Sequence, residues 1–182
     1  MPIIMPSPRT GKEPQIHESA YIAPTAVIIG DVIIGEGSNI WFGAVLRGDW
    51  GAIAIGKNSS IQENVTIHIE MGKSVMIGDN CIIGHHCMIH GPTEISNGCV
   101  IGVGAKVLHN SKLGEGCTVG AGAVLLNKEI PPRRLVVGIP ADIKKKLPET
   151  GKLAGERTSK EYVKNGRTFK DFFEKNPEFN KF

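Results

Sequence analysis

Several features that mark other classes of protein are missing from this 182-residue sequence. No stretch approaches the ~20 apolar residues that span a bilayer, so we expect no membrane partner. The first residues, MPIIMPSPRTGK, lack a charged segment followed by an apolar one. We therefore expect no secretory signal and take the cytoplasm as the default location. The net charge of +3 is spread widely apart from Lys144, Lys145 and Lys146, which argues against a nucleic-acid partner.

Aromatic residues and cysteines are also scarce. Phe, Trp and Tyr make up 5% of the chain, and the four cysteines include no CxxC pair of the kind that binds zinc. Glycine is frequent instead, with 23 residues, as expected where chain segments stack closely.

An aliphatic residue recurs every six positions along most of the chain. The series is unbroken over positions 16–46, resets after a step of nine, runs over 55–67, resets after a step of ten, and continues over 77–125. The residue four positions after the aliphatic one is small or β-branched in fifteen of the eighteen hexads, and all four cysteines fall in this second column. One large and one small inward side chain per six-residue turn predict an all-β solenoid of short parallel strands.

The repeat resembles the hexapeptide-repeat family. That resemblance implies a left-handed parallel β-helix with three hexads per triangular coil, and the eighteen hexads then make about six coils. We name the three faces a, b and c after the hexads that begin at Ile16, Ile22 and Ile28. The segment EIPPRRLVVGIPA resembles the strand on which the chain leaves such a helix.

The remaining sequence predicts a helical tail. Thr158 and Glu161 have capping-box spacing, and Tyr162, Phe169 and Phe173 fall on one helical face. We therefore expect a β-helix domain over residues 1–140, including the exit strand, and a C-terminal α-helix within 141–182 that packs on the outside of the prism.

Four of the six histidines lie in the stretch 68–91, and the repeat places them in space. On face c, Arg47, His68 and His90 each follow the aliphatic residue of successive coils. His68 and His90 should therefore stack, and two imidazoles one coil apart can converge on one ion with Zn–N bonds of ~2.0–2.1 Å. His85 lies around a corner, two positions into a face-b turn. It can instead face the His68 and His90 of a second molecule, and a threefold ring is the simplest assembly that closes such contacts.

The motifs around these histidines resemble those of the γ-class carbonic anhydrase family. The resemblance is carried by NVTIH, IGHHCMIHG, LRGDW and SIQEN. It implies a homotrimer with His68, His85 and His90 as metal ligands at the subunit interface, and Zn²⁺, or else Fe²⁺ or Co²⁺, as the cofactor. It also implies reversible hydration of CO2 to bicarbonate by a metal-bound hydroxide. We expect His86 and His109 to be surface residues and not ligands.

The same resemblance implies roles for five further residues. Gln62 would hydrogen-bond the nucleophile or orient CO2. Arg47 and Asp49 would hold the interface together and help to place bicarbonate. Tyr162 would match a tyrosine of the tail that reaches toward the site, and Glu70 would be the proton shuttle.

The sequence departs from the family pattern where protons leave the site. The loop after His68 is short, and Glu70 is its one carboxylate. Trp50 stands where the archetype has an acidic residue, and Ser60 and Glu63 replace the usual Asn and Asp. Proton transfer is therefore the step of CO2 hydration that the sequence supports least.

Three other functions are compatible with the repeat. Hexapeptide acyltransferases use a single histidine as general base, a thioesterase would act on acyl-CoA, and a metal-binding trimer could be structural or only weakly catalytic. Stoichiometric zinc that is lost on His90→Ala argues against the first, and measurable CO2 hydration argues against the last.

Overall fold

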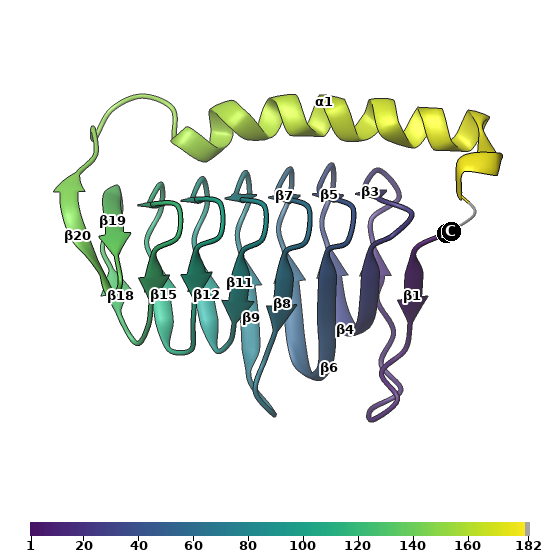
Figure 1. Ribbon diagram of the computed structural model, residues 1–182, viewed down its shortest axis with the longest axis horizontal. Coiled ribbons are helices and arrows are strands. Elements are labelled where there is room, and N and C mark those ends of the chain that lie inside the picture. Colours follow the sequence, from purple (N-terminus) through teal and green to yellow (C-terminus); the bar gives the residue numbers. More distant parts are fainter. Residues whose placement is uncertain (181–182) are drawn as a thin grey trace.

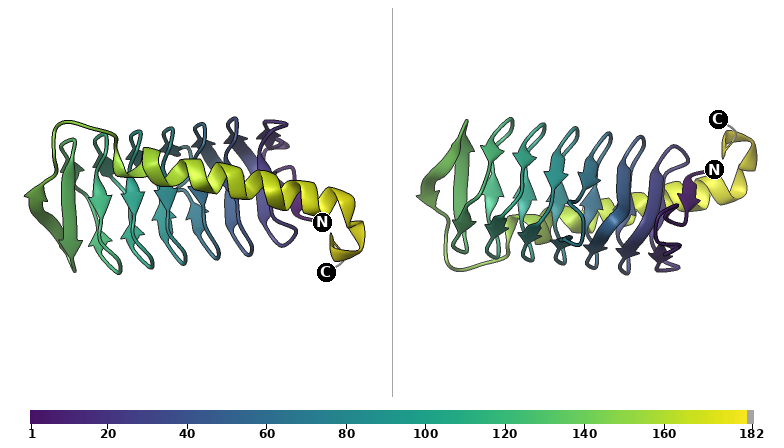
Figure 2. Two further views of the ribbon diagram at one scale, coloured as in Figure 1. Left: turned by 90° about the horizontal axis from the view of Figure 1, so that it is seen from above. Right: turned by 90° about the horizontal axis from the view of Figure 1, so that it is seen from below.

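A computed structural model describes residues 1–180. It is a left-handed parallel β-helix with one long α-helix along its side (Figure 1). The predicted fold class is confirmed. The row of coils runs the length of the molecule, and the α-helix follows this row in each of the three views (Figures 1 and 2).

Three flat faces form the prism. Strands β4 and β6 bend around the corner between faces c and a, and so join those two faces into one 12-stranded sheet. Face b forms an 8-stranded sheet that ends in the antiparallel strand β20 (Ala141–Lys146). The strands of face b are β3 (Tyr21–Ile22), β5 (Asn39–Ile40), β7 (Ser60–Ile61), β10 (Ile82–Ile83), β13 (Val100–Ile101), β16 (Thr118–Val119) and β19 (Arg134–Gly138).

The joined sheet contains the strands of faces c and a, which meet at β4 and β6. Face c holds β1 (Ile3–Met5), the first parts of β4 (Val27–Ile34) and β6 (Val45–Ile55), β8 (Thr66–His68), β11 (Met88–His90), β14 (Lys106–Val107) and β17 (Val124–Leu125). Face a holds β2 (Gln15–Ile16), the second parts of β4 and β6, β9 (Ser74–Ile77), β12 (Thr93–Ile95), β15 (Ser111–Leu113) and β18 (Glu129–Ile130).

The two inward columns predicted from the repeat form the core. Every residue of the aliphatic column is buried except Ile16 and Ile22, which are partly buried and pack against it. The small column is buried throughout, from Ala20 to Ala123, and includes the four free cysteines. Large and small side chains therefore alternate around each coil and fill a narrow interior.

The β-helix is longer than the six coils expected. Face b has seven parallel strands, from β3 to β19. Ile130 pairs with Leu113, and Val136 pairs with Val119, so the segment read as an exit strand continues the coils. The six-residue count breaks at a five-residue step after Leu125, although Ile130 and Val136 still point inward and are buried.

The tail forms helix α1 (Ala154–Lys175), followed by the 3₁₀ turn η1 (Pro177–Asn180). The expected capping box is wrong, because the helix begins four residues before Thr158. The Leu153 amide instead donates to the Glu156 carboxylate at 3.0 Å, and the Thr158 hydroxyl lies in the second turn and donates to the Ala154 carbonyl.

Helix α1 contacts β3, β5, β7 and β10 on face b. Aromatic rings fill this contact, with Phe169 5.2 Å from Trp41 and 6.0 Å from Tyr21 between ring centroids. Within residues 1–180, no helix combines the length and the apolar character needed to cross a bilayer.

Candidate metal centre

His68 and His90 stand directly above one another at the ends of β8 and β11. The two strands pair in parallel with His90 opposite His68, and Arg47 on β6 lies opposite His68 on its other side. The imidazole centroids are 5.6 Å apart. The predicted stacking of these three side chains is confirmed. The stack forms because the ten-residue step between Ile67 and Ile77 adds a loop without shifting the register of face c.

Asp49 joins this stack from the bend in β6. Its carboxylate accepts a hydrogen bond from Nη1 of Arg47 at 2.8 Å, and its other oxygen is 3.4 Å from Nε2 of His68. Burial acts to raise the pKa of Asp49, but the hydrogen bond and charge of Arg47 outweigh it and hold this pKa below its usual value. The pair expected at a subunit interface thus forms within one chain.

His68 favours its neutral form. Burial is the largest cause of its lowered pKa, and the positive charge of Arg47 adds to it, while the contact with Asp49 opposes both. The ring of Trp50, which replaces the acidic residue of the family pattern, lies 6.4 Å from that of His68. A neutral imidazole is the form that binds a metal ion.

His85 lies on another part of the surface, in the turn that follows β10. Its Nδ1 is 2.7 Å from Oε2 of Glu63, and its backbone amide donates to Oε1 of Gln62 at 3.2 Å. Gln62 is buried, whereas His85 and Glu63 are half exposed. When Nδ1 carries the proton, the contact with Glu63 leaves Nε2 free to act as a ligand.

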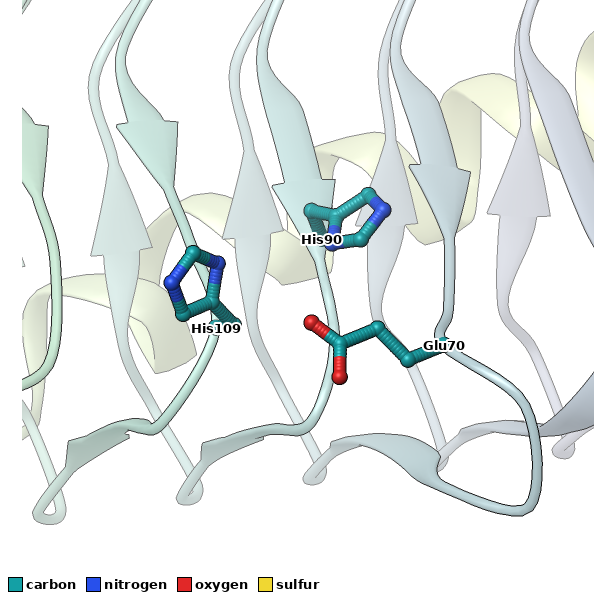
Figure 3. A group of neighbouring side chains, drawn as sticks. All are labelled: Glu70, His90 and His109. Atoms are coloured by element: carbon teal, nitrogen blue, oxygen red, sulfur yellow. The ribbon is translucent and has the colours of Figure 1, made fainter.

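One group of three metal-binding side chains within residues 1–180 has ligand atoms that all lie within 4.8 Å of one another. It consists of Glu70, His90 and His109, and it includes neither His68 nor His85 (Figure 3). Glu70 lies on the loop between β8 and β9. Among the described residues, a single chain therefore does not bring His68, His85 and His90 together.

Comparisons with known proteins give the family of this chain. The family model described as bacterial transferase hexapeptide (six repeats) matches residues 13–48 and 92–127. A protein of Methanocaldococcus jannaschii named "Probable carbonic anhydrase" is 45% identical over 157 residues, which is 86% of this chain and 99% of that protein. A carbonic anhydrase of Geobacillus kaustophilus is 38% identical over 163 residues, which is 90% of each protein.

The mitochondrial gamma carbonic anhydrase 2 of Arabidopsis thaliana is 44% identical over 88 residues, a match that spans 45% of this chain and 32% of that relative's length. The chain belongs to the γ-carbonic anhydrase-like family of hexapeptide-repeat proteins. The crystal structure of a Bacillus cereus protein described as a "putative acetyltransferase" has a TM-score of 0.86 at 33% identity. That likeness covers 94% of this chain and 98% of the other.

In this γ-carbonic anhydrase-like protein, Tyr162 lies with the His85 group and not with the His68 group. It is on α1, where its ring centroid is 6.1 Å from that of Trp41. Partial burial raises its pKa, and the negative charge of Glu63 adds to this effect. The residues expected at the site therefore form two sets, one around His68 and His90 and the other around His85.

Glu63 and His109 lie beside the candidate ligands His85 and His90, although neither was assigned a role from the sequence. Glu63 and His85 both lie two positions after the aliphatic residue of consecutive face-b hexads, and Ile61 pairs with Ile83. The repeat could therefore have predicted that pair. His109 is exposed, as expected, but its closeness to Glu70 depends on how the loop after His68 folds, which the repeat does not determine.

Proposed function

We propose that this chain is a metal-dependent carbonic anhydrase that interconverts CO2 and bicarbonate as a homotrimer. His68 and His90 of one subunit and His85 of its neighbour would hold the ion, with Zn²⁺ as the expected metal and Fe²⁺ or Co²⁺ as alternatives. The observation that carries this proposal is the division of the three histidines between two surfaces, with His68 and His90 stacked on one and His85 held by Glu63 on the other.

The donor set suits such an ion. His68 and His90 are stacked one coil apart, and the lowered pKa of His68 keeps its ring neutral. Glu63 orients His85 through Nδ1. When bound, a divalent ion with an open coordination position lowers the pKa of a water ligand toward neutrality and so supplies the nucleophile that hydration needs.

The neighbouring residues would bind and orient the reactants. Arg47, held by Asp49, offers a cation to bicarbonate beside His68. Gln62 would orient CO2 from the His85 side, with its Nε2 as donor because its Oε1 already accepts from the His85 amide. Glu70 would carry the proton away, since its exposed carboxylate lies beside His90.

Metal content and hydration kinetics test this function together. We expect about one divalent ion per subunit and metal-dependent CO2 hydration in a stopped-flow assay, with both lost in His90→Ala. His86→Ala is a matched control, because His86 is an exposed neighbour of His85. Hydration that survives His90→Ala unchanged, or protein that takes up no divalent ion, would overturn the proposal.

Mixed trimers test the division of the site between subunits. Neither His85→Ala nor His90→Ala should hydrate CO2 alone. When the two variants are unfolded together and refolded, some interfaces combine the intact His68 and His90 of one subunit with the intact His85 of another. We expect hydration to return in the mixture, and the shared site is wrong if it does not while mixed trimers form.

Acyl transfer is the second candidate, and the structural likeness to a protein described as an acetyltransferase favours it. Such a reaction needs one histidine base and no metal. Acetyl-CoA turnover that persists after removal of all bound metal would support it, and a related thioesterase would release free CoA in the same assay.

We place the protein in the cytoplasm, where its four free, buried thiols would remain reduced.

A further inference from the structure

Glu70, His90 and His109 come together on one subunit although 39 positions separate the first from the last. His90 ends β11, His109 follows β14 on the next coil, and Glu70 reaches both from the loop after β8. In Figure 3 the Glu70 carboxylate lies below the ring of His90 and beside that of His109. Two coils and one loop thus direct three metal-binding groups at the same place.

The separations suit a common ion. Two ligands that each lie ~2.1 Å from a metal are at most ~4.2 Å apart, and the three ligand atoms here are all within 4.8 Å of one another. Glu70 and His109 are exposed, so their side chains can close the remaining gap without moving the coils. Two imidazoles and one carboxylate are a common donor set for first-row divalent ions.

We propose that Glu70, His90 and His109 form a second divalent-metal site that lies wholly within one subunit. It differs from the site shared between subunits because it needs neither His68 nor the neighbour's His85. Zn²⁺, Co²⁺ and Fe²⁺ fit its mixed nitrogen and oxygen donors. The single negative charge of Glu70 partly balances such an ion.

The two sites share His90, so they compete. An ion held by the second site also occupies Glu70, the carboxylate that the proposed function assigns to proton transfer. Excess metal should therefore inhibit hydration, and His109→Ala should relieve that inhibition. This consequence rests on the proposed function, whereas the existence of the second site does not.

Co²⁺ binding to variants that lack the shared site tests the proposal without any activity assay. The double variant His68→Ala with His85→Ala leaves the shared site only His90. We expect it to bind about one Co²⁺ per chain, with visible absorption bands that report nitrogen and oxygen ligands. Adding His109→Ala, or Glu70→Gln, should weaken that binding at least tenfold, whereas adding His86→Ala should leave it unchanged.

The double variant could fail to fold because His68 is partly buried. The single variant His85→Ala keeps His68 and so allows the same test. Residual Co²⁺ in this variant could lie either on the His68–His90 pair or on the second site. The second site offers three ligands and the pair only two, so the second site should hold the ion, and adding His109→Ala should then lower the affinity at least tenfold. Unchanged affinity on adding His109→Ala, in this background or in the folded double variant, overturns the proposal.

Discussion

Nδ1 of His85 lies 2.7 Å from Oε2 of Glu63, which occupies the same position of the turn one coil earlier. The two side chains are 41% and 36% exposed, so packing alone does not orient the imidazole ring. A carboxylate beside Nδ1 stabilises the tautomer in which Nε2 is free, and such partners are a regular feature of histidines that bind metals.

Glu63→Ala removes this partner and leaves all three proposed ligands in place. We expect metal affinity to fall about 10–100-fold, the usual effect of losing a residue that orients a ligand. Competition with a chromophoric chelator measures it. Glu94→Ala is the control, because Glu94 pairs with Lys112 on face a, away from His85. Equal affinity in Glu63→Ala and the wild type would show that Glu63 does not orient His85.

Arg47→Ala should raise the pKa of His68. The positive charge of Arg47 contributes to the lowered pKa of this histidine, and its removal also frees the Asp49 carboxylate, which acts in the opposite direction. Both changes favour the protonated ring. An NMR titration of the metal-free protein measures the shift, and Lys57→Ala, which removes a distant surface cation, should leave it unchanged. A pKa that falls or stays constant in Arg47→Ala contradicts this electrostatic account.

The four cysteines should resist thiol reagents in the folded protein, because all are buried. Burial raises the pKa of Cys87 to about 11 and also raises that of Cys117. At pH 8 a thiol with a pKa near 11 is ionised in about one molecule per thousand, and the thiolate is the reactive form. We expect a chromogenic disulfide reagent to label four thiols in denaturant and none rapidly in buffer. Fast labelling of the folded protein would mean that the coils open locally.

Gly155→Ala should loosen the start of α1. A β-carbon there would lie 2.3 Å from the Asn80 carbonyl oxygen and 2.7 Å from that of Gly98, both parts of the backbone. Such overpacking typically costs about 1–3 kcal/mol. Hydrogen exchange of the amides in the first helical turns should rise accordingly.

Gly166→Ala is the matched comparison on the same helix. Its β-carbon would approach the β-carbons of Asn39 and Tyr21 at 3.2 and 3.3 Å, a close contact and not a clash. Alanine also favours the helix by about 1 kcal/mol over glycine, which offsets that contact. A larger loss of protection in Gly166→Ala than in Gly155→Ala would contradict the packing described here.

The repeat made the face-c stack predictable. In a solenoid, the position of a residue within its hexad decides whether it points in or out, and counting hexads decides what lies above and below it. Arg47, His68 and His90 could be aligned in this way because the steps of nine and ten residues leave the register intact. The same reasoning found the buried columns.

Counting hexads gave a wrong result where the six-residue period changed. The sequence predicts an exit strand where Ile130 and Val136 form a further coil, because one missing residue breaks the hexad although the ladder of paired strands continues. The start of α1 was also missed, because its first amide is satisfied by Glu156 and not by Thr158. Both errors concern local steps that the six-residue pattern does not contain.

By itself, the sequence determined the architecture and the separation of His85 from His68 and His90, because the count of hexads along the chain assigns each residue to a face. Only the tertiary structure decided which charged groups meet these histidines. The Asp49 contact depends on the bend of β6, and the placing of Glu70 beside His109 depends on a loop without a repeat. Those contacts depend on how the bend and the loop place the side chains in three dimensions, and no periodic pattern encodes that.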